Sequence, residues 1–148
     1  MIDVGFNLLI FDQKWTDGAC GYGNLFDQGY GLETTALSTA LFTEGASCGS
    51  CYEIKCTNSQ WCKPGAGTIR VKATNFCPPW YQDTPEAWCN PPRKHLDLSM
   101  KMFLNIAEYR GGIVPVLFRQ GMSPKKGGVK FELKGNRNWL WVVVYMVG

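Results

Sequence analysis

Short runs in which hydrophobic and polar residues alternate recur along this chain of 148 residues. Alternation with a period of two is typical of β-strands that bury one face. It predicts strands over residues 52–55, 68–74, 113–118, 129–134 and 139–147, the last two joined by a turn at residues 135–136. The pattern therefore predicts a mainly β protein.

Two segments have helical periodicity instead. Residues 34–42 place four apolar side chains on one helical face, and Gly45 stands where such a helix would end. A second helix is expected after Ser99, a good N-cap, and it continues to about Arg110, before Gly111 and Gly112. We expect only these two short helices among the strands.

Turn-forming residues divide the chain further. The segment 75–92 is rich in proline and reads as a loop, and residues 123–128 read as a linker. The length fits about one ordinary domain. Two strands after the linker are too few for an independently stable unit, so the second module is expected to be incomplete.

The charge and hydropathy of the chain exclude few classes of function by themselves. The net charge is +3, and residues 119–148 carry six basic side chains against one acidic one. This basic end is either an ordinary solvated surface or a polyanion-binding surface, and it is too weak to indicate nucleic acid. No apolar run is long enough to span a membrane, and the N-terminus lacks the basic region and cleavage site of a secretory signal.

The seven cysteines lie between Cys20 and Cys89, and four of them fall within residues 48–62. Zinc sites, a redox pair and structural disulfides are the three candidate roles. The spacing lacks a second separated knuckle, His95 is the sole histidine, and the residues after Cys51 read as strand. We therefore expect structural disulfides in an exported protein, without a metal or another cofactor.

Several motifs occur in fixed order, in residues 18–25 (GACGYGNL), 37–42 (LSTALF), 47–56 (SCGSCYEIKC), 73–79 (ATNFCPP), 88–92 (WCNPP) and 95–98 (HLDL). Together they closely resemble the plant alpha-expansins, from about Asp17 to the last residue. The resemblance implies a six-stranded double-psi β-barrel, related to family-45 glycoside hydrolases, followed by a carbohydrate-binding β-sandwich. It also implies an extracellular protein that loosens the plant cell wall in a pH-dependent manner, without measurable hydrolysis.

The resemblance suggests four parts: an atypical N-terminal segment (1–16), the barrel (17–120), a linker (121–128) and the truncated start of the sandwich (129–148). Residues 12–16 (DQKWT) replace the family's first barrel strand, whose Thr and Tyr line the groove. An unpaired sheet edge is expected there. The expected signal peptide is also absent, so this chain resembles a truncated or mis-spliced family member.

Asp97 matches the aspartate of the family's His-Phe-Asp motif, the counterpart of the hydrolases' general acid, and His95 is the first residue of that motif. The competing interpretation is that Asp97 caps the following helix. Glycoside hydrolysis ordinarily uses two carboxyl groups, and no second one is clear, although Asp17, Asp83 and Glu86 lie in loops. We therefore expect glucan binding without cleavage.

Open sugar-binding grooves use aromatic platforms with polar groups at their edges. The candidate platforms are Tyr22, Trp80, Tyr81 and Trp88, and the candidate hydrogen-bonding residues are Thr74 and Asn75, with Trp139 on the second module. The competing interpretation is that some of these rings belong to the core. The expected partner is cellulose, xyloglucan or a related β-glucan, bound by a monomer.

The family pattern implies the disulfides Cys20–Cys48, Cys56–Cys62 and Cys77–Cys89. The family partner of Cys51 aligns with Ser123, so Cys51 is expected to be a free thiol. Three rival functions stay open: a family-45-like endoglucanase, a barwin-like carbohydrate-binding defence protein, and a gene product without function.

Overall fold

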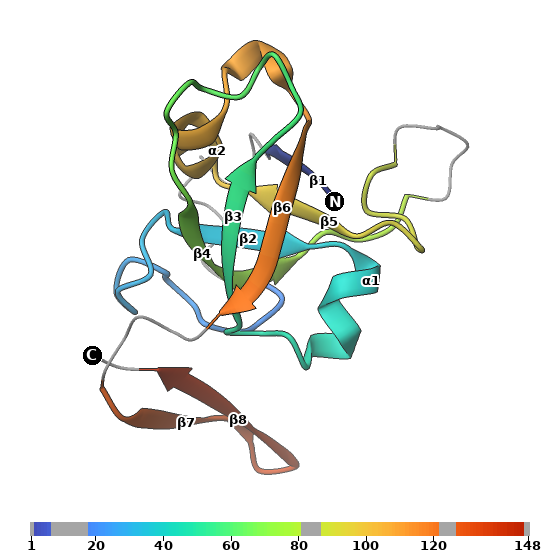
Figure 1. Ribbon diagram of the computed structural model, residues 1–148. Helices are drawn as coiled ribbons and strands as arrows, with labels where there is room; N and C mark the ends of the chain where they lie inside the picture. The colour runs from blue at the N-terminus through green and yellow to red at the C-terminus, as the bar shows by residue number, and fades with distance from the viewer. Residues whose placement is uncertain (1, 7–17, 81–86, 122–126, 147–148) are drawn as a thin grey trace.

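The computed structural model describes residues 2–6, 18–80, 87–121 and 127–146. Six strands close into a barrel and two more form a separate antiparallel hairpin (Figure 1). The barrel strands, in chain order, are β1 (Ile2–Phe6), β2 (Thr34–Leu37), β3 (Cys51–Cys56), β4 (Ile69–Phe76), β5 (His95–Leu98) and β6 (Val114–Gly121). Around the barrel their order is β1-β5-β2-β4-β3-β6. The prediction of a mainly β fold with a six-stranded barrel is confirmed.

Strand β1 closes the barrel from a segment that the sequence analysis placed outside it. It pairs in parallel with β5 and antiparallel with β6, and Val4 is fully buried. The range of 17–120 for the barrel is therefore too short at its N-terminal side. The expected open edge is also wrong, because closure of the sheet removes edges and residues 2–6 fill the place. Residues 12–16 lie outside the described residues.

Strand β2 occupies residues for which a helix was predicted. All four of its residues are buried, and it pairs with β4 on one side and β5 on the other. A short apolar run fits a buried strand as well as a helical face, so pairing on both sides decided its conformation. The helix α1 (Thr39–Phe42) begins only after it and is followed by a 3-10 turn, η2 (Thr43–Gly45).

Helix α2 (Met100–Ile106) follows β5 directly. The Ser99 hydroxyl accepts a hydrogen bond from the Met102 backbone N–H at 3.4 Å, as expected of an N-cap. Phe103 and Ile106 are fully buried in the barrel core. The helix ends earlier than Arg110, and a 3-10 turn, η3 (Tyr109–Gly111), follows.

Strand β5 was not predicted, and β4 extends through Asn75 and Phe76, which were expected in a loop. In both places strand pairing within the barrel determines the conformation, because the local sequence has only a weak strand signal. The predicted strands at 52–55, 68–74 and 113–118 correspond to β3, β4 and β6.

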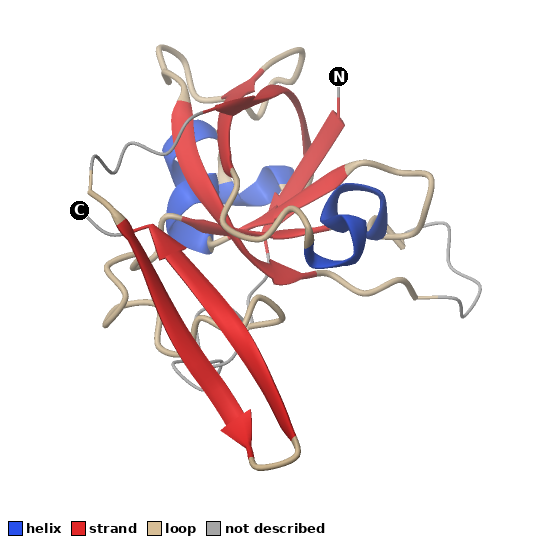
Figure 2. Ribbon diagram, turned by 90° about the horizontal axis from the view of Figure 1, so that it is seen from below, coloured by secondary structure: helices blue, strands red, loops and turns tan. Residues whose placement is uncertain are grey.

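The second sheet is a hairpin of β7 (Val129–Asn136) and β8 (Trp139–Met146), which Figure 2 shows as a long ribbon beside the barrel. Asn136 pairs with Trp139, so the turn consists of Arg137 and Asn138. The predicted turn at 135–136 is therefore two residues too early. Both residues that were expected to form it continue the ladder of β7.

One face of this hairpin is anchored to the barrel domain. Tyr145 and Val143 are buried against Tyr22 and Tyr30, and the rings of Tyr22 and Tyr145 lie 5.5 Å apart. The Lys134 ammonium also donates a hydrogen bond of 3.1 Å to the Gly21 carbonyl. This packing supplies the support that two isolated strands lack.

The structure contains the three disulfides that the resemblance implies, Cys20–Cys48, Cys56–Cys62 and Cys77–Cys89. Cys51 is free and buried, opposite Gly121 in the β3–β6 ladder. The described part of the chain contains no group of His, Cys, Asp or Glu side chains suited to a metal ion. It also contains no helix long and apolar enough to cross a membrane.

Candidate functional site

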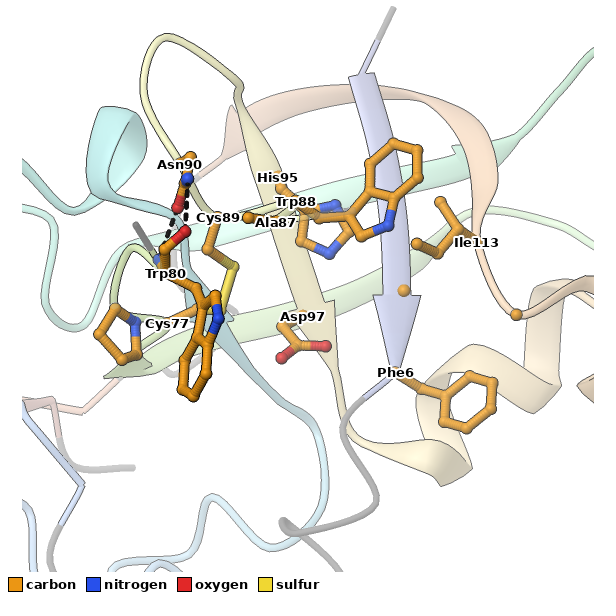
Figure 3. Close-up of a pocket in the computed structure, with 13 residues that line it drawn as sticks. Phe6, Cys77, Trp80, Ala87, Trp88, Cys89, Asn90, His95, Asp97 and Ile113 are labelled. Carbon is orange, nitrogen blue, oxygen red and sulfur yellow. Dashed lines mark hydrogen bonds between the residues drawn. A yellow bond between two sulfur atoms is a disulfide. The ribbon is translucent and has the colours of Figure 1, made fainter. Parts of the chain in front are cut away.

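A cavity of about 370 Å³ lies beside β5. Four segments build it: β1, the loop from β4 to β5, β5 itself, and the residues just before β6 (Figure 3). The lining residues used below are Gly5, Trp80, Trp88, Asn90, His95 and Asp97. The cavity therefore gathers residues from both ends of the barrel sequence.

Asp97 projects its carboxyl group from β5 into this cavity (Figure 3). Its backbone is held on both sides, because it lies opposite Gly5 in β1 and opposite Ala36 in β2. The Thr35 hydroxyl also donates a 3.0 Å hydrogen bond to the Asp97 carbonyl. Asp97 therefore stands on a rigid strand, two residues before the Ser99 cap, and it is not the helix cap.

His95 lies two residues earlier on the same strand and is only 3% exposed. Its backbone N–H donates to the Ser38 hydroxyl, and its carbonyl accepts from the Ser38 N–H, both at 3.0 Å. A Cβ atom at Gly5 would lie 3.3 Å from His95 Nε2, so glycine leaves room for the imidazole. The Trp88 ring lies 6.0 Å from the imidazole.

Burial is the main reason that the pKa of His95 falls from 6.5 to about 4; the nearby positive charge of Arg93 contributes to this shift, and a hydrogen bond of the imidazole with the Asp3 backbone opposes it. The imidazole therefore stays neutral in mildly acidic solution. In the unfolded chain the same group takes up a proton below its ordinary pKa of 6.5.

This difference makes stability depend on pH. Between pH 6.5 and 4 the unfolded chain binds the extra proton, so the free energy of unfolding should fall as the pH is lowered, by up to ~3 kcal/mol. Urea unfolding across this range measures the slope. His95→Gln removes the titrating group, and we expect a flatter profile; identical slopes in the two proteins would contradict the assignment.

Trp80 presents an indole at the mouth of the cavity and is 63% exposed. Asn90 holds its backbone: the Asn90 amide oxygen accepts from the Trp80 N–H at 2.6 Å, and the amide nitrogen donates to the Trp80 carbonyl at 2.8 Å. The Cys77–Cys89 disulfide ties the same loop (Figure 3). The sequence analysis missed Asn90, whose position directly after Cys89 was its only signal.

Trp88, a second indole on this loop, is half-buried and lies beneath the Arg93 guanidinium, 5.0 Å from the ring centroid. Flat apolar faces of this kind bind the C–H faces of sugars, and carboxyl and amide groups bind their hydroxyls. The cavity thus brings Asp97, His95, Trp80 and Trp88 together as the sequence analysis expected.

Three other predicted residues do not line this cavity. Tyr22 is 4% exposed in the cluster beneath the hairpin, so it is a core residue rather than an open platform. Thr74 is 2% exposed. The Asn75 amide oxygen accepts from the Ala19 and Phe76 N–H groups at 2.9 and 2.8 Å, so it stabilises a turn. This packing places Tyr22 and Thr74 in the interior, and the substrate contacts expected of these three residues stay predictions.

Trp139 lies on the hairpin, where its ring stacks on Trp141 with centroids 4.4 Å apart and an interplanar angle of 16°. Each ring is about half exposed. They form a second aromatic surface, separate from the residues that line the cavity.

Tyr81, Asp17, Asp83 and Glu86 fall outside the described residues. Among the described residues that line the cavity, Asp97 is the single carboxylate.

Basic side chains among residues 119–148 form ion pairs and hydrogen bonds within the molecule. The Arg119 guanidinium forms an ion pair with Glu53, which also pairs with Arg70, and Lys134 bonds to the Gly21 carbonyl. These contacts favour the interpretation of an ordinary surface over that of a polyanion-binding one.

A family model described as lytic transglycolase, of the double-psi β-barrel type, matches residues 34–118. Among curated proteins, Expansin-A23 and Expansin-A25 of Arabidopsis thaliana are 60% and 61% identical over 132 residues, 88% of this chain. Expansin-A13 of Oryza sativa subsp. japonica is 49% identical over 137 residues. The chain spans about half the length of these relatives, 47% of Expansin-A23.

The expansin of Clavibacter michiganensis has a similar fold, with a TM-score of 0.65 at 21% identity over 96% of this chain and 61% of that one. A mutant of that expansin, solved in complex with cellohexaose, matches equally well. The bacterial structures share the fold, and the two Arabidopsis proteins share 60% and 61% sequence identity with this chain over 132 residues. The chain therefore belongs to the double-psi β-barrel family described as lytic transglycolase and, within it, to the alpha-expansins.

Proposed function

We propose that this chain binds β-glucan in the Asp97 cavity and promotes extension of the plant cell wall without hydrolysing the glucan. The observation that carries the proposal is the combination of one rigidly held carboxyl group with the exposed Trp80 indole in one cavity. An indole face binds a sugar ring, and the carboxyl group binds its hydroxyls.

The absence of cleavage rests on the chemistry of glycoside hydrolysis. That reaction ordinarily needs a second carboxyl group as base or nucleophile. Asp97 has no such companion among the described lining residues, and the neighbouring His95 is neutral and buried. The site is therefore suited to holding a glucan, and not to the two-carboxylate reaction.

The relatives support the substrate class and the location. The plant proteins that share 60% identity are expansins, and the bacterial expansin has been solved with cellohexaose, a β-glucan fragment. We infer an extracellular protein of the cell wall whose partners are cellulose or matrix glucans such as xyloglucan. The stacked Trp139 and Trp141 rings provide a second contact with glucan on the hairpin.

Wall extension under constant load tests the proposal. Purified protein added to heat-inactivated plant walls in acidic buffer should increase their extension, with no soluble reducing sugar released. Sugar release from soluble glucan would support the family-45-like endoglucanase instead. Preferential binding to chitin fragments over cellulose would support the barwin-like alternative, and no extension with no binding would contradict both the activity and the site.

A further inference from the structure

The cavity beside β5 has a second aromatic side, across Asp97 from Trp80. Phe6, the last residue of β1, lines the cavity there, together with Gly112 and Ile113. Figure 3 shows the Asp97 carboxyl group between the Trp80 indole and the Phe6 ring. The carboxyl group therefore has an aromatic ring on each side.

The barrel core holds the Phe6 ring in place. Phe6 lies opposite Leu98 in the ladder of β1 and β5. Its half-buried ring contacts the ring of Phe103 in α2, with centroids 4.8 Å apart, and Phe103 is fully buried. Phe6 therefore connects the interior of the barrel to the lining of the cavity.

Tyr109 continues this aromatic surface beyond the cavity. Its ring lies 5.2 Å from the Phe6 ring, with an interplanar angle of 36°, and Tyr109 is 55% exposed. Tyr109 is the first residue of η3, where the Gly111 N–H donates to the Glu108 carbonyl at 2.9 Å and the Gly112 N–H donates to the Tyr109 carbonyl at 3.1 Å. These bonds fix the backbone from which the ring projects.

The η3 turn is also held against the rest of the molecule. The Glu108 N–H donates to the Trp61 carbonyl at 2.9 Å. A Cβ atom at Gly111 would lie 2.8 Å from the Trp61 Cβ, so only glycine allows this close packing of the turn. Because the turn is already ordered, a ligand that binds Tyr109 loses little affinity to ordering of the backbone.

A single exposed aromatic side chain is common on protein surfaces and needs no function. Phe26, which is 59% exposed and does not line the cavity, is an example. Tyr109 differs because its ring contacts Phe6, a ring that lines the cavity. Its turn also leads directly into Gly112 and Ile113, which line the cavity as well.

The chemistry of the Phe6–Tyr109 pair suits a sugar ring. The apolar faces of aromatic rings bind the C–H faces of sugars, and the phenol hydroxyl of a tyrosine can exchange a hydrogen bond with a sugar hydroxyl. Tyr109 lies outside the set of residues that line the cavity. A ligand that contacts Trp80, Asp97 and Tyr109 together must therefore be a chain of sugars rather than a single ring.

We propose that Phe6 and Tyr109 form a further sugar-binding subsite, so that one β-glucan chain runs from Trp80 past Asp97 to Tyr109. This inference rests on the proposed binding of β-glucan at Asp97 and adds the course of the chain to it. The subsite selects long glucan chains over short oligosaccharides, because only a long chain reaches the Tyr109 ring.

Calorimetric titration with cellotriose and cellohexaose tests the subsite. Tyr109→Ala should weaken the binding of cellohexaose roughly threefold to tenfold, the range of one aromatic contact, and should leave the binding of cellotriose unchanged. Tyr109→Phe keeps the ring and should retain most of the affinity for cellohexaose. Phe26→Ala removes a similarly exposed ring outside the cavity and should change neither affinity.

Nuclear magnetic resonance of the unsubstituted chain tests the course of the glucan independently of any variant. Cellohexaose should shift both the Trp80 indole N–H signal and the backbone amide signals of residues 109–112. Cellotriose should shift the Trp80 signal and leave those of residues 109–112 in place.

The outcomes separate this subsite from the proposed function. If the unsubstituted chain binds neither oligosaccharide, glucan binding at Asp97 is wrong and the subsite fails with it. If the chain binds both, but Tyr109→Ala binds cellohexaose normally or loses affinity for both oligosaccharides equally, the subsite is overturned while binding at Asp97 stands. Signals of residues 109–112 that do not respond to cellohexaose overturn the subsite in the same way.

Discussion

Asp97→Asn should reduce wall extension and glucan affinity about tenfold or more while the barrel stays folded. The substitution keeps the shape of the side chain and removes its charge. Hydrogen bonds to a charged group contribute about 1.5–3 kcal/mol, which corresponds to roughly a tenfold to hundredfold change in affinity. Binding to insoluble cellulose and extension of walls under load both measure the effect.

Asp27→Asn is the matched control for this substitution. It makes the same chemical change at an exposed position outside the cavity, so activity should be unchanged. The thermal unfolding of both variants shows whether the fold is retained. Full activity of a folded Asp97→Asn protein would contradict the role of the carboxyl group, because no other described lining residue carries one.

Removal of the Cys77–Cys89 disulfide, by serine at both positions, should destabilise the protein by about 3 kcal/mol and also weaken glucan binding. The bond closes a loop with a sequence separation of 12, and cross-links of this size stabilise mainly by restricting the unfolded chain. The loop carries Trp80 and Trp88, so its release also disorders the aromatic wall of the cavity. Denaturant unfolding and cellulose binding measure the two effects separately.

The Cys56–Cys62 disulfide provides the comparison, since it closes a still shorter loop whose cysteines do not line the cavity. Its removal should also destabilise the protein, by about 2–3 kcal/mol. Under conditions in which both variants are folded, only the Cys77–Cys89 variant should bind glucan more weakly. Equal binding by the two variants would show that the disulfide does not position the indoles.

Local signals in the sequence were reliable where one short segment decides the structure. Ser99 caps α2 because its hydroxyl reaches an N–H three residues away, a contact that needs no other part of the chain. Strands β3 and β6 followed from alternation, since each buries one face in a single core. The motif order led to the disulfide pairs and to Asp97, although only through the family resemblance.

The sequence-based predictions were wrong where a segment distant along the chain supplies the strand or side chain that packs against a residue. Residues 34–37 have an apolar pattern that fits a helix, and only pairing with β4 and β5 makes them a strand. Tyr22 has an aromatic side chain suited to a sugar-binding platform, but Val143 and Tyr145 of the hairpin bury it. Residues 2–6 gave no strong strand signal, yet the gap between β5 and β6 places them in the barrel.

The sequence alone determined the class of the fold from local patterns; motifs in fixed order determined the family and, through the family resemblance, the three disulfides. The same resemblance predicts Asp97 as the acidic residue of the proposed site. The tertiary structure decided which candidate aromatic side chains are open to a ligand and which are core. It also decided that Asn90 holds Trp80. Burial depends on what packs against a residue, and that partner lies elsewhere in the chain.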